Sequence, residues 1–435
     1  MILSLFLVAV VRSVRMDTGI QARICLEPAL AVGSWLESVA IETDEGKKWA
    51  ADPENPGAAT TDLYSGMGGV ILFFVELYRS TEETSYLAEA ESGADYLLAQ
   101  LPAESSPGAS AGLYTGFAGV GYVLEEVYKA TDRAKYHAGA KHCLDLLESS
   151  GEKIGEGVQW GKVTDIISGG AGIGLYLLYA HQETGEERAK ALAEQAGRRL
   201  LELGTAENDG LKWRMDPDSD MMMPNFAHGT AGISYFLARL HRATGEPEFL
   251  DGALAGGRYL QSITNEEGLI FHHVPGGEDL FYLGWCHGPV GTGRLYYELW
   301  RQTKDERWRE ALVKASRGVM ESGIPQVRTE GFWNNVSQCC GSAGVADYFL
   351  YLFENTQQQD YVRFGFYMIA DMLDRATRDE TGMRWIQAEH RTQPELLVAQ
   401  TGYAQGAAGI GLAILHWDAF YQNRQRSIRL PDSPF

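Results

Sequence analysis

A glycine-marked motif recurs seven times along this chain of 435 residues. Each copy reads small or polar residue, Gly, any residue, small residue, Gly, and then an aliphatic residue or Thr. The first glycines of the seven copies are Gly66, Gly116, Gly169, Gly229, Gly288, Gly341 and Gly406. The steps between them are 50, 53, 60, 59, 53 and 65 residues. A period of this size is typical of a repeated supersecondary unit, so the repeat must shape the whole fold.

Each motif leads into an apolar stretch with the length and composition of a buried helix. Residues 70–78, 120–128 and 173–179 show this, and none of them has the alternation of a half-exposed strand. A polar turn follows, and then an amphipathic segment rich in good helix formers, of which residues 187–201 are the clearest example. One unit therefore consists of an apolar inner helix and an amphipathic outer helix.

Seven such units predict an all-α fold, a closed α/α toroid of seven inner and seven outer helices. An open superhelical solenoid of helix pairs is the alternative arrangement. A solenoid would need a polar capping repeat at each end, and the sequence contains none. Because the inner helices are apolar nearly all round and begin with close-packing glycines, we expect the ring to close.

The uninterrupted repeat predicts a single domain in spite of the length of the chain. We expect an N-terminal segment, residues 1–61, that includes the first outer helix and packs on the toroid of residues 62–435. The apolar run at residues 2–11 is too short to span a bilayer. It also lacks the basic start and the cleavage site of a signal peptide. Translation from Met16 would remove this run altogether.

The charge and the cysteine content exclude several classes of protein. Lys and Arg number 37 and Asp and Glu 58, which gives a formal net charge of −21. Nucleic acids and anionic membranes need a basic surface, so neither is an expected partner. Five cysteines, an odd number in a long chain, indicate a reducing compartment rather than a disulfide framework. We therefore expect a cytoplasmic protein without stable membrane insertion.

The first residue of each motif lies near the N-terminus of an inner helix, where unpaired N–H groups and the helix dipole favour negative charge. Repeats one to three carry Ser or Thr there, which we interpret as structural N-caps. Repeats four to six carry His, His and Cys, and a cysteine directly precedes two of these residues. The seven occupants are Ser65, Thr115, Ser168, His228, His287, Cys340 and Gln405.

Cys286, Cys339 and Cys340 share this phase of the repeat, so three thiols should meet at one mouth of the ring. Helix N-termini favour the thiolate that metals require. Three thiolates leave the fourth tetrahedral position open, as in a catalytic zinc site. The alternatives are a packed core thiol for Cys286, and a vicinal disulfide or one ligand beside one buried thiol for the other two. Cys25 and Cys143 fall outside the phase and are expected in the core.

The seven motifs, the WCHG segment at residues 285–288, the His-Gly pair at His228 and the cysteines of the sixth repeat resemble the lanthionine synthetase C-like family, which includes the lantibiotic cyclases. The resemblance covers about residues 62–417. It implies a zinc-dependent enzyme with one Zn²⁺ per chain. The implied reaction adds a cysteine thiol to dehydroalanine or dehydrobutyrine in a dehydrated precursor peptide and closes a thioether ring. The implied partners are that peptide and a separate dehydratase.

The resemblance also assigns roles to individual residues. Cys286 and Cys339 take the places of the first two zinc ligands, and Cys340 takes that of the third, which is His in many members. His228 resembles the catalytic histidine, which would deprotonate the thiol or protonate the enolate; the alternative is a helix-capping histidine. Asp165 matches an acidic position that would orient His228 or lie near the zinc. An exposed N-cap or first-turn carboxylate is its alternative.

Two further positions complete the implied site. His287 follows the first ligand and is expected as a second proton donor. Tyr282 stands where some cyclases carry Arg, so it can donate a hydrogen bond to an enolate but supplies no positive charge. The pair His272-His273 lies in an expected loop, and we interpret it as solvated rather than ligating.

The residues also make chemical sense by themselves. A bound zinc ion lowers the pKa of a substrate thiol, and addition to the double bond creates an enolate that needs stabilisation and a proton. The alternatives to a peptide cyclase are an enzyme that adds glutathione or another small thiol to dehydroamino acids, and a non-catalytic peptide-binding scaffold. A toroidal carbohydrate enzyme would need paired acids at the mouth, and the acids do not follow the phase of the motif.

Overall fold

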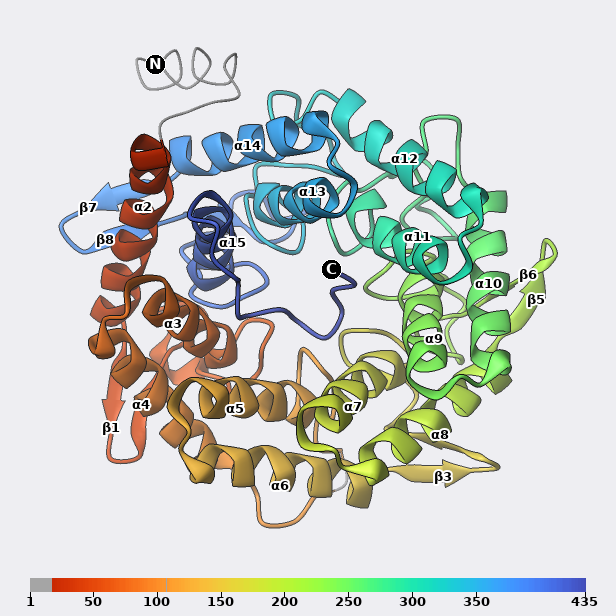
Figure 1. Ribbon diagram of the computed structural model, residues 1–435, viewed down its shortest axis with the longest axis horizontal. Helices are drawn as coiled ribbons and strands as arrows, with labels where there is room; N and C mark the ends of the chain where they lie inside the picture. Colours follow the sequence, from red (N-terminus) through yellow and green to blue (C-terminus); the bar gives the residue numbers. More distant parts are fainter. Residues whose placement is uncertain (1–17, 107) are drawn as a thin grey trace.

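Two concentric rings of helices form the protein in a computed structural model that describes residues 18–106 and 108–435 (Figure 1). The described residues form fourteen α-helices. The inner helices are α3 (Met67–Thr81), α5 (Phe117–Thr131), α7 (Gly170–Thr184), α9 (Thr230–Thr244), α11 (Pro289–Thr303), α13 (Ser342–Thr356) and α15 (Ala407–Tyr421). The outer helices are α2 (Thr18–Ser38), α4 (Thr84–Gln100), α6 (Ala134–Ser150), α8 (Glu187–Leu203), α10 (Pro247–Ser262), α12 (Glu306–Glu321) and α14 (Gln359–Asp374).

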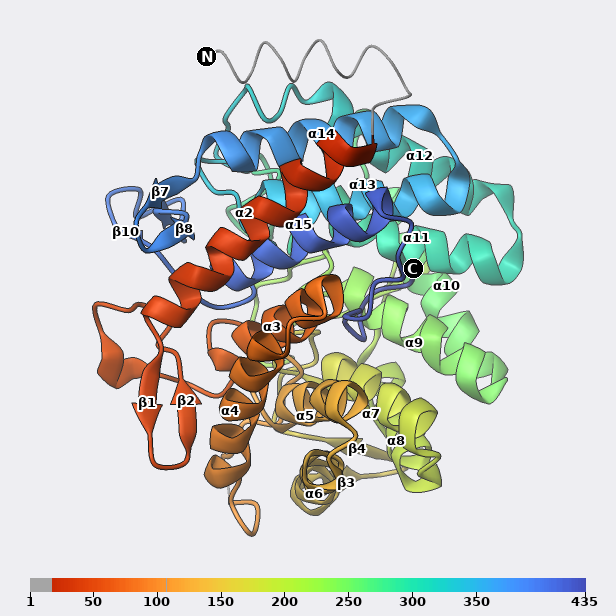
Figure 2. The ribbon, with the colours of Figure 1, turned by 60° about the vertical axis from the view of Figure 1, so that its left-hand side comes forward.

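The ring closes between its first and last elements. Each inner helix from α3 to α13 packs against the outer helix that follows it in the chain. The last inner helix, α15, packs against the first outer helix, α2. Neighbouring inner helices also touch all the way round, including α15 with α3 (Figures 1 and 2). The predicted α/α toroid is therefore confirmed, and the open solenoid is wrong.

Five small β-hairpins add to the helical fold, and the sequence analysis did not anticipate them. Four of them follow an outer helix, and the fifth follows the fourth directly. They are β1 (Ile41–Thr43) with β2 (Gly46–Lys48), β3 (Glu152–Ile154) with β4 (Gly157–Gln159), β5 (Thr205–Glu207) with β6 (Gly210–Lys212), β7 (Thr377–Asp379) with β8 (Gly382–Arg384), and β9 (Gln387–Ala388) with β10 (Leu397–Val398). A short 3₁₀ helix, η1 (Pro56–Ala58), precedes the first motif.

The inner helices begin one residue later than expected. The first glycine of each motif is the N-cap, so the cap residue has no side chain with which to accept a hydrogen bond from the helix. The interpretation of Ser65, Thr115 and Ser168 as N-caps is therefore wrong. Asp62 and Asp165 satisfy the loop in their repeats instead, because each carboxylate accepts hydrogen bonds from two backbone N–H groups of the motif.

A ring of backbone hydrogen bonds joins the seven loops that lead into the inner helices. Each loop donates an N–H to a carbonyl of the next loop, and the seventh loop donates back to the first. The bonds run from Tyr64 to Tyr114, Tyr114 to Ile167, Ile166 to Ala227, Ala227 to Cys286, Cys286 to Cys339, Cys339 to Ala404 and Ala404 to Tyr64, at 2.8–3.3 Å. This ring fixes equivalent residues of adjacent repeats beside each other.

The C-terminal tail, residues 422–435, crosses the middle of the toroid (Figure 1). Its Asp432 is fully buried, and the carboxylate accepts hydrogen bonds from Trp285 Nε1 at 2.9 Å and from Arg294 Nη1 at 3.0 Å. Trp285 immediately precedes Cys286, so the tail supports the cysteine side of the ring from within.

Only part of what was predicted for the N-terminal segment falls within the described residues. The apolar run at residues 2–11 and the alternative start at Met16 lie outside them, and the division of the chain at residues 61 and 62 stays a prediction. No helix of the described part combines the length and the apolar character needed to cross a membrane.

Candidate metal centre

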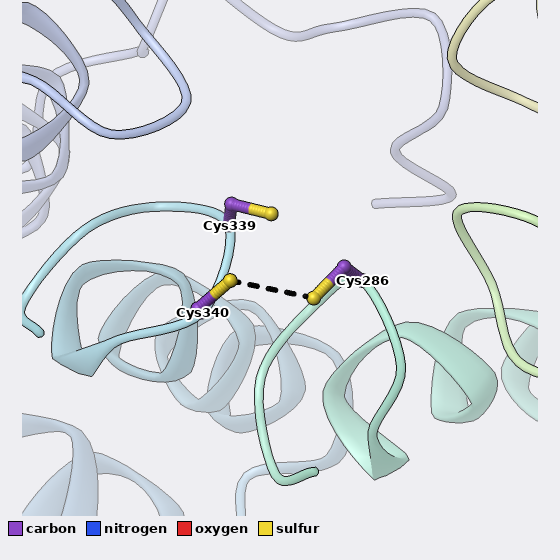
Figure 3. A group of neighbouring side chains, drawn as sticks. All are labelled: Cys286, Cys339 and Cys340. Atoms are coloured by element: carbon purple, nitrogen blue, oxygen red, sulfur yellow. Dashed lines mark hydrogen bonds between the residues drawn. The ribbon is translucent and has the colours of Figure 1, made fainter. Parts of the chain in front are cut away.

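The sulfur atoms of Cys286, Cys339 and Cys340 meet at the mouth of the ring (Figure 3). All three lie within 4.8 Å of one another, and Cys286 Sγ is 3.5 Å from Cys340 Sγ. Tetrahedral Zn–S bonds of about 2.3 Å place two sulfurs about 3.8 Å apart. The three side chains are buried, and the cysteines of the described residues are free, so the vicinal disulfide is wrong. The cluster can hold one metal ion.

Backbone geometry explains why two separate loops bring their cysteines together. Cys286 and Cys339 each directly precede a motif, and the N–H of Cys286 donates to the carbonyl of Cys339 at 3.3 Å. The second glycine of each motif lets the loop fold back onto its helix. A Cβ at Gly291 would lie 2.0 Å from the Trp285 carbonyl, and one at Gly344 would lie 2.1 Å from the Gln338 carbonyl. No larger residue fits at these two positions without moving the cysteine loops.

Hydrogen bonds among the three thiols shift their pKa values in different directions. Hydrogen bonds donated by the thiols of Cys286 and Cys340 lower the pKa of Cys339 well below its ordinary value. The pKa of Cys286 is raised by its bond to Cys339 and by burial. The bond to Cys286 lowers the pKa of Cys340, but the bond to Cys339 and burial outweigh it. The hydrogen bonds among the thiols thus favour the thiolate at Cys339 and disfavour it at Cys286 and Cys340. Metal ligation requires all three to be thiolates.

Two residues that were not among the predicted site residues donate hydrogen bonds to the cysteine sulfurs. The hydroxyl of Tyr64 donates to Cys339 Sγ at 3.5 Å, and Gln405 Nε2 donates to Cys340 Sγ at 3.7 Å. Tyr64 precedes the first motif and Gln405 begins the seventh. Their positions in the repeat are the signal that could have identified them, since the cysteines occupy the same two positions.

His228 and Asp165 form the polar pair predicted beside the cysteines. Asp165 Oδ2 lies 2.7 Å from His228 Nδ1, and the carboxylate is buried while 27% of the His228 side chain is exposed. Burial alone would lower the pKa of His228. The hydrogen bond and the charge of Asp165 outweigh burial, so the pKa is raised above its ordinary value. Asp165 is therefore the residue that orients His228, and it is not an exposed carboxylate.

His287 and His272 stack at the wall of the site, with ring centroids 3.9 Å apart. His287 is buried and its Nδ1 has no hydrogen-bond partner. Burial, reinforced by the neighbouring histidines, lowers the pKa of His287 well below its usual range and that of His272 to about 4. Both rings are therefore neutral near pH 7. The expectation that His272 is a solvated loop residue is wrong, because the loop folds inward onto His287 and Tyr282.

Tyr282 and Arg391 face the same small cavity as the cysteines. The cavity has a volume of about 280 Å³, and its lining includes the three cysteines, His228 and His287. Burial and the charges of Cys340 and Cys286 raise the pKa of Tyr282, while the positive charge of Arg391 opposes them. Arg391 comes from the turn between β9 and β10, outside the motif. It brings to this wall the positive charge that Tyr282 lacks.

The residues predicted from the sequence therefore lie in or directly behind the lining of a single pocket. Asp165 lies behind His228, and Cys286, Cys339, Cys340, His228, His287 and Tyr282 line the cavity. Cys25 and Cys143 lie apart, buried in α2 and α6, as expected of core thiols. Residues 389–392 complete the lining, and no motif marks them in the sequence.

The fold and the site together define a closed α/α toroid with three buried cysteine sulfurs, compatible with a metal site, at its mouth. The chain belongs to the lanthionine synthetase C-like protein family, whose model matches residues 57–428. Among curated proteins, none is significantly similar in sequence.

Solved structures show the same fold at low identity. Nisin cyclase is 18% identical, with a TM-score of 0.64, and the match covers 94% of this chain and 96% of that one. The Lin0763 protein from Listeria innocua is 14% identical, with a TM-score of 0.52 over 92% and 97% of the two chains. The α-1,6-mannanase from Salegentibacter sp. HEL1_6 is 13% identical, with a TM-score of 0.51 over 91% and 99%.

The likeness to a mannanase extends to the fold alone. Glycoside hydrolysis requires a pair of carboxylic acids on either side of the scissile bond. Within the described residues, the lining of the cysteine pocket includes one carboxylate, that of Glu389. The described lining therefore combines three cysteine sulfurs, compatible with a metal site, with a single carboxylate.

Proposed function

We propose that this protein is a zinc-dependent thioether-forming enzyme that adds a cysteine thiol to a dehydroalanine or dehydrobutyrine residue of a peptide. One observation carries the proposal: three buried cysteine sulfurs lie within 4.8 Å of one another on the same cavity as an Asp-oriented histidine. A metal-held nucleophile and a positioned proton carrier are the two components that this addition needs.

Cys286, Cys339 and Cys340 would hold one zinc ion and leave its fourth position toward the cavity. A zinc ion bound there lowers the pKa of a substrate thiol and holds the thiolate at neutral pH. Tyr64 and Gln405 donate hydrogen bonds to two of the protein sulfurs. These bonds orient the ligands and moderate the negative charge of an all-thiolate set.

His228 would carry the proton through the reaction. With its Nδ1 bonded to Asp165, the other ring nitrogen is available to accept the proton of the incoming thiol. The sulfur lone pair then forms the C–S bond at the β-carbon, and the π electrons of the double bond move to the carbonyl oxygen as an enolate. Return of the proton from His228 to the α-carbon restores the carbonyl and leaves His228 neutral.

Arg391 and Tyr282 are the groups best placed to stabilise the enolate. A guanidinium and a phenol on the same wall offer a positive charge and a hydrogen-bond donor to a developing oxyanion. The lowered pKa of His287 keeps its ring neutral, so in this proposal it donates a hydrogen bond to the enolate and not, as the resemblance implied, a second proton. The positive charge that some cyclases place at the Tyr282 position thus comes from a different loop here.

A small thiol is a second candidate for the nucleophile. The cavity of about 280 Å³ is small enough that the thiol end of glutathione would fill much of it. For that reason the test includes glutathione with the same acceptor. The partners in this proposal are a dehydrated precursor peptide and a separate dehydratase that supplies it.

The experiment incubates the zinc-loaded protein with a synthetic peptide that contains one dehydroalanine and one cysteine. Ring closure is an isomerisation, so the peptide keeps its mass and loses its free thiol. Alkylation with N-ethylmaleimide followed by mass spectrometry therefore separates open peptide, which gains the alkyl group, from closed peptide, which does not. We expect closed peptide with the wild-type protein and open peptide with Cys286→Ala.

The controls separate the three functions. Addition of glutathione to the acceptor without ring closure would assign the small-thiol activity instead. Binding of the peptide without either reaction would assign a scaffold. Equal ring closure by the wild-type protein and Cys286→Ala would contradict the proposed role of the metal centre.

A further inference from the structure

The longest step of the repeat contains a hairpin that reaches the cysteine pocket. The step from Gly341 to Gly406 spans 65 residues, and it includes the strands β9 and β10, which are paired through Leu397 with Ala388 and Val398 with Gln387. The turn between them, residues 389–392, lines the cavity together with the three cysteines. A substrate in the cavity would therefore lie against this turn.

The same hairpin exposes an unusual amount of apolar side chain. Six large hydrophobic residues are exposed in the described part of the chain, and three of them belong to this hairpin. They are Leu396 at 56%, Leu397 at 55% and Ile386 at 47%. Exposed apolar side chains that gather beside a site mark a binding surface more often than chance exposure does.

The outer edge of the hairpin is also open. Trp333 Nε1 and Asn335 Nδ2 both donate to the carbonyl of Ala388, which ties β9 to the body of the protein. Within the described residues, β10 pairs with β9 alone. Proteins usually blunt such an edge with charges or proline; here Pro394 and Glu395 precede the strand, and Leu396 and Leu397 stand at the edge itself. An open edge with apolar side chains suits an extended peptide segment.

The size of the cavity requires such a surface. Pockets that enclose a drug-sized ligand measure about 300–1,000 Å³, and the cysteine cavity measures about 280 Å³. A cavity of this size would enclose only part of a peptide substrate. The flanking residues of a peptide substrate must therefore lie on the rim, where the β9–β10 hairpin is the apolar element.

We propose that the β9–β10 hairpin is the docking surface for the substrate peptide, and that it binds apolar side chains in the extended segment next to the reacting residues. The inference rests on the proposed function for the identity of the peptide. Leu396, Leu397 and Ile386 would contact the apolar side chains, and the turn with Arg391 would guide the reacting residue toward the cysteines.

The test compares two synthetic peptides that each carry one dehydroalanine and one cysteine. The flanking residues are Leu and Val in the first peptide and Ser and Gln in the second. We expect the wild-type protein to close the apolar peptide with a kcat/KM roughly tenfold higher than the polar one. A Leu396→Ser, Leu397→Ser double variant should lose that preference and keep its rate for glutathione with N-acetyl-dehydroalanine amide. Tyr367→Ser, an exposed aromatic on the outer helix α14, is the matched control and should keep the preference.

Two outcomes would overturn the inference: equal rates for both peptides with the wild-type protein, or an unchanged preference in the double variant. Failure of the proposed function has a different signature, since no thiol addition would then occur even with the small acceptor. In that case, fluorescence anisotropy with the labelled apolar peptide still decides the question. Binding that the double variant loses and Tyr367→Ser keeps supports the surface, and binding that all three proteins share contradicts it.

Discussion

The chemistry of each thiol in this protein depends on its place in the repeat. Cys286 and Cys339 stand directly before a motif, where a backbone hydrogen bond joins adjacent loops, and Cys340 begins a motif. Cys143 has the same side chain in an outer helix, where burial raises its pKa and where, among the described residues, it belongs to no cluster of three potential metal ligands. A thiol becomes a metal ligand here because the loops bring it to other thiols.

Metal binding should therefore depend on Cys286 and not on Cys143. Cys286→Ala removes one of three ligands, so we expect the zinc content to fall from about one ion per chain to near zero after dialysis. Cys143→Ala should retain the full complement. Elemental analysis by mass spectrometry measures both, and zinc retained by Cys286→Ala would contradict the assigned ligand set.

The Asp165–His228 pair should make stability depend on pH with a definite sign. The pKa of His228 is raised in the folded protein. The interaction with the imidazolium is therefore fully present below the unfolded pKa of about 6.5, and it is lost as pH rises through the raised folded pKa. Asp165→Asn keeps an oxygen acceptor for the backbone and removes the charge. We expect it to destabilise the protein most at acidic pH.

Urea unfolding of the metal-free protein at a series of pH values measures this effect. The difference in unfolding free energy between wild type and Asp165→Asn should shrink as pH increases. A difference that stays constant or grows toward alkaline pH would contradict the assigned ion pair.

Most site residues at this scale were predictable because they follow the motif. His228, His287 and Cys340 begin a motif, and Cys286 and Cys339 directly precede one, so phase alone brings them to one mouth. Arg391 was beyond prediction, since it comes from an insertion whose turn has no periodic signal. His272 was misjudged because a loop histidine is usually solvated, and only the stacking on His287 shows otherwise.

At the scale of single elements, four of the hairpins repeat one construction. Each second strand begins with Gly, and a tryptophan follows the strand and donates its indole N–H to an outer-helix carbonyl thirteen residues earlier. The bonds join Trp49 to Leu36, Trp160 to Leu147, Trp213 to Leu200 and Trp385 to Met372, at 2.6–2.8 Å. This signal, Gly-x-x-Trp, is visible in the sequence, but three-residue strands are too short for periodicity to reveal them.

Replacing one of these tryptophans tests the role of the hairpins. Trp213→Phe keeps most of the apolar volume and leaves the Leu200 carbonyl without its donor. Because an unsatisfied buried polar group costs about 1–3 kcal/mol, we expect a loss of that size in the free energy of unfolding. Trp417→Phe is the matched control, since Trp417 is equally buried and its Nε1 has no partner. Equal losses in the two variants, measured by urea unfolding, would show that the hydrogen bond contributes nothing.

At the scale of the whole molecule, closure is what assembles the site. Cys339 donates its N–H to Ala404, and Ala404 donates to Tyr64, so the first and seventh repeats meet beside the sixth. Tyr64 of the first repeat reaches Cys339 Sγ only because the ring closes, whereas Gln405 belongs to the seventh repeat, which adjoins the sixth in any case. The repeat predicts closure, whereas the tail through the axis has no counterpart in the repeat and could not be predicted from it.

The tail should contribute strongly to stability through one ion pair. Asp432 is the buried partner of Arg294, and Asp432→Ala would leave that guanidinium without a counter-charge. Removing one partner of a buried pair costs about 3–5 kcal/mol. Urea unfolding should show a loss of this size, together with a change in the fluorescence of Trp285, which loses its acceptor.

The control for this variant is Asp360→Ala. The carboxylate of Asp360 is 80% exposed and pairs with Arg363 on an outer helix, so the loss should be below about 1 kcal/mol. If the C-terminal tail contributed no buried ion pair, Asp432→Ala and Asp360→Ala would lose the same small amount of unfolding free energy.

X-ray absorption at the zinc edge is the most direct test of the metal centre and its open position. For the protein alone we predict three Zn–S distances of about 2.3 Å and one lighter ligand. Addition of a cysteine-containing peptide should raise the number of sulfur neighbours to four, because the substrate thiol takes the remaining position. Fewer than three sulfurs in the free protein, or an unchanged count with peptide bound, would contradict the account.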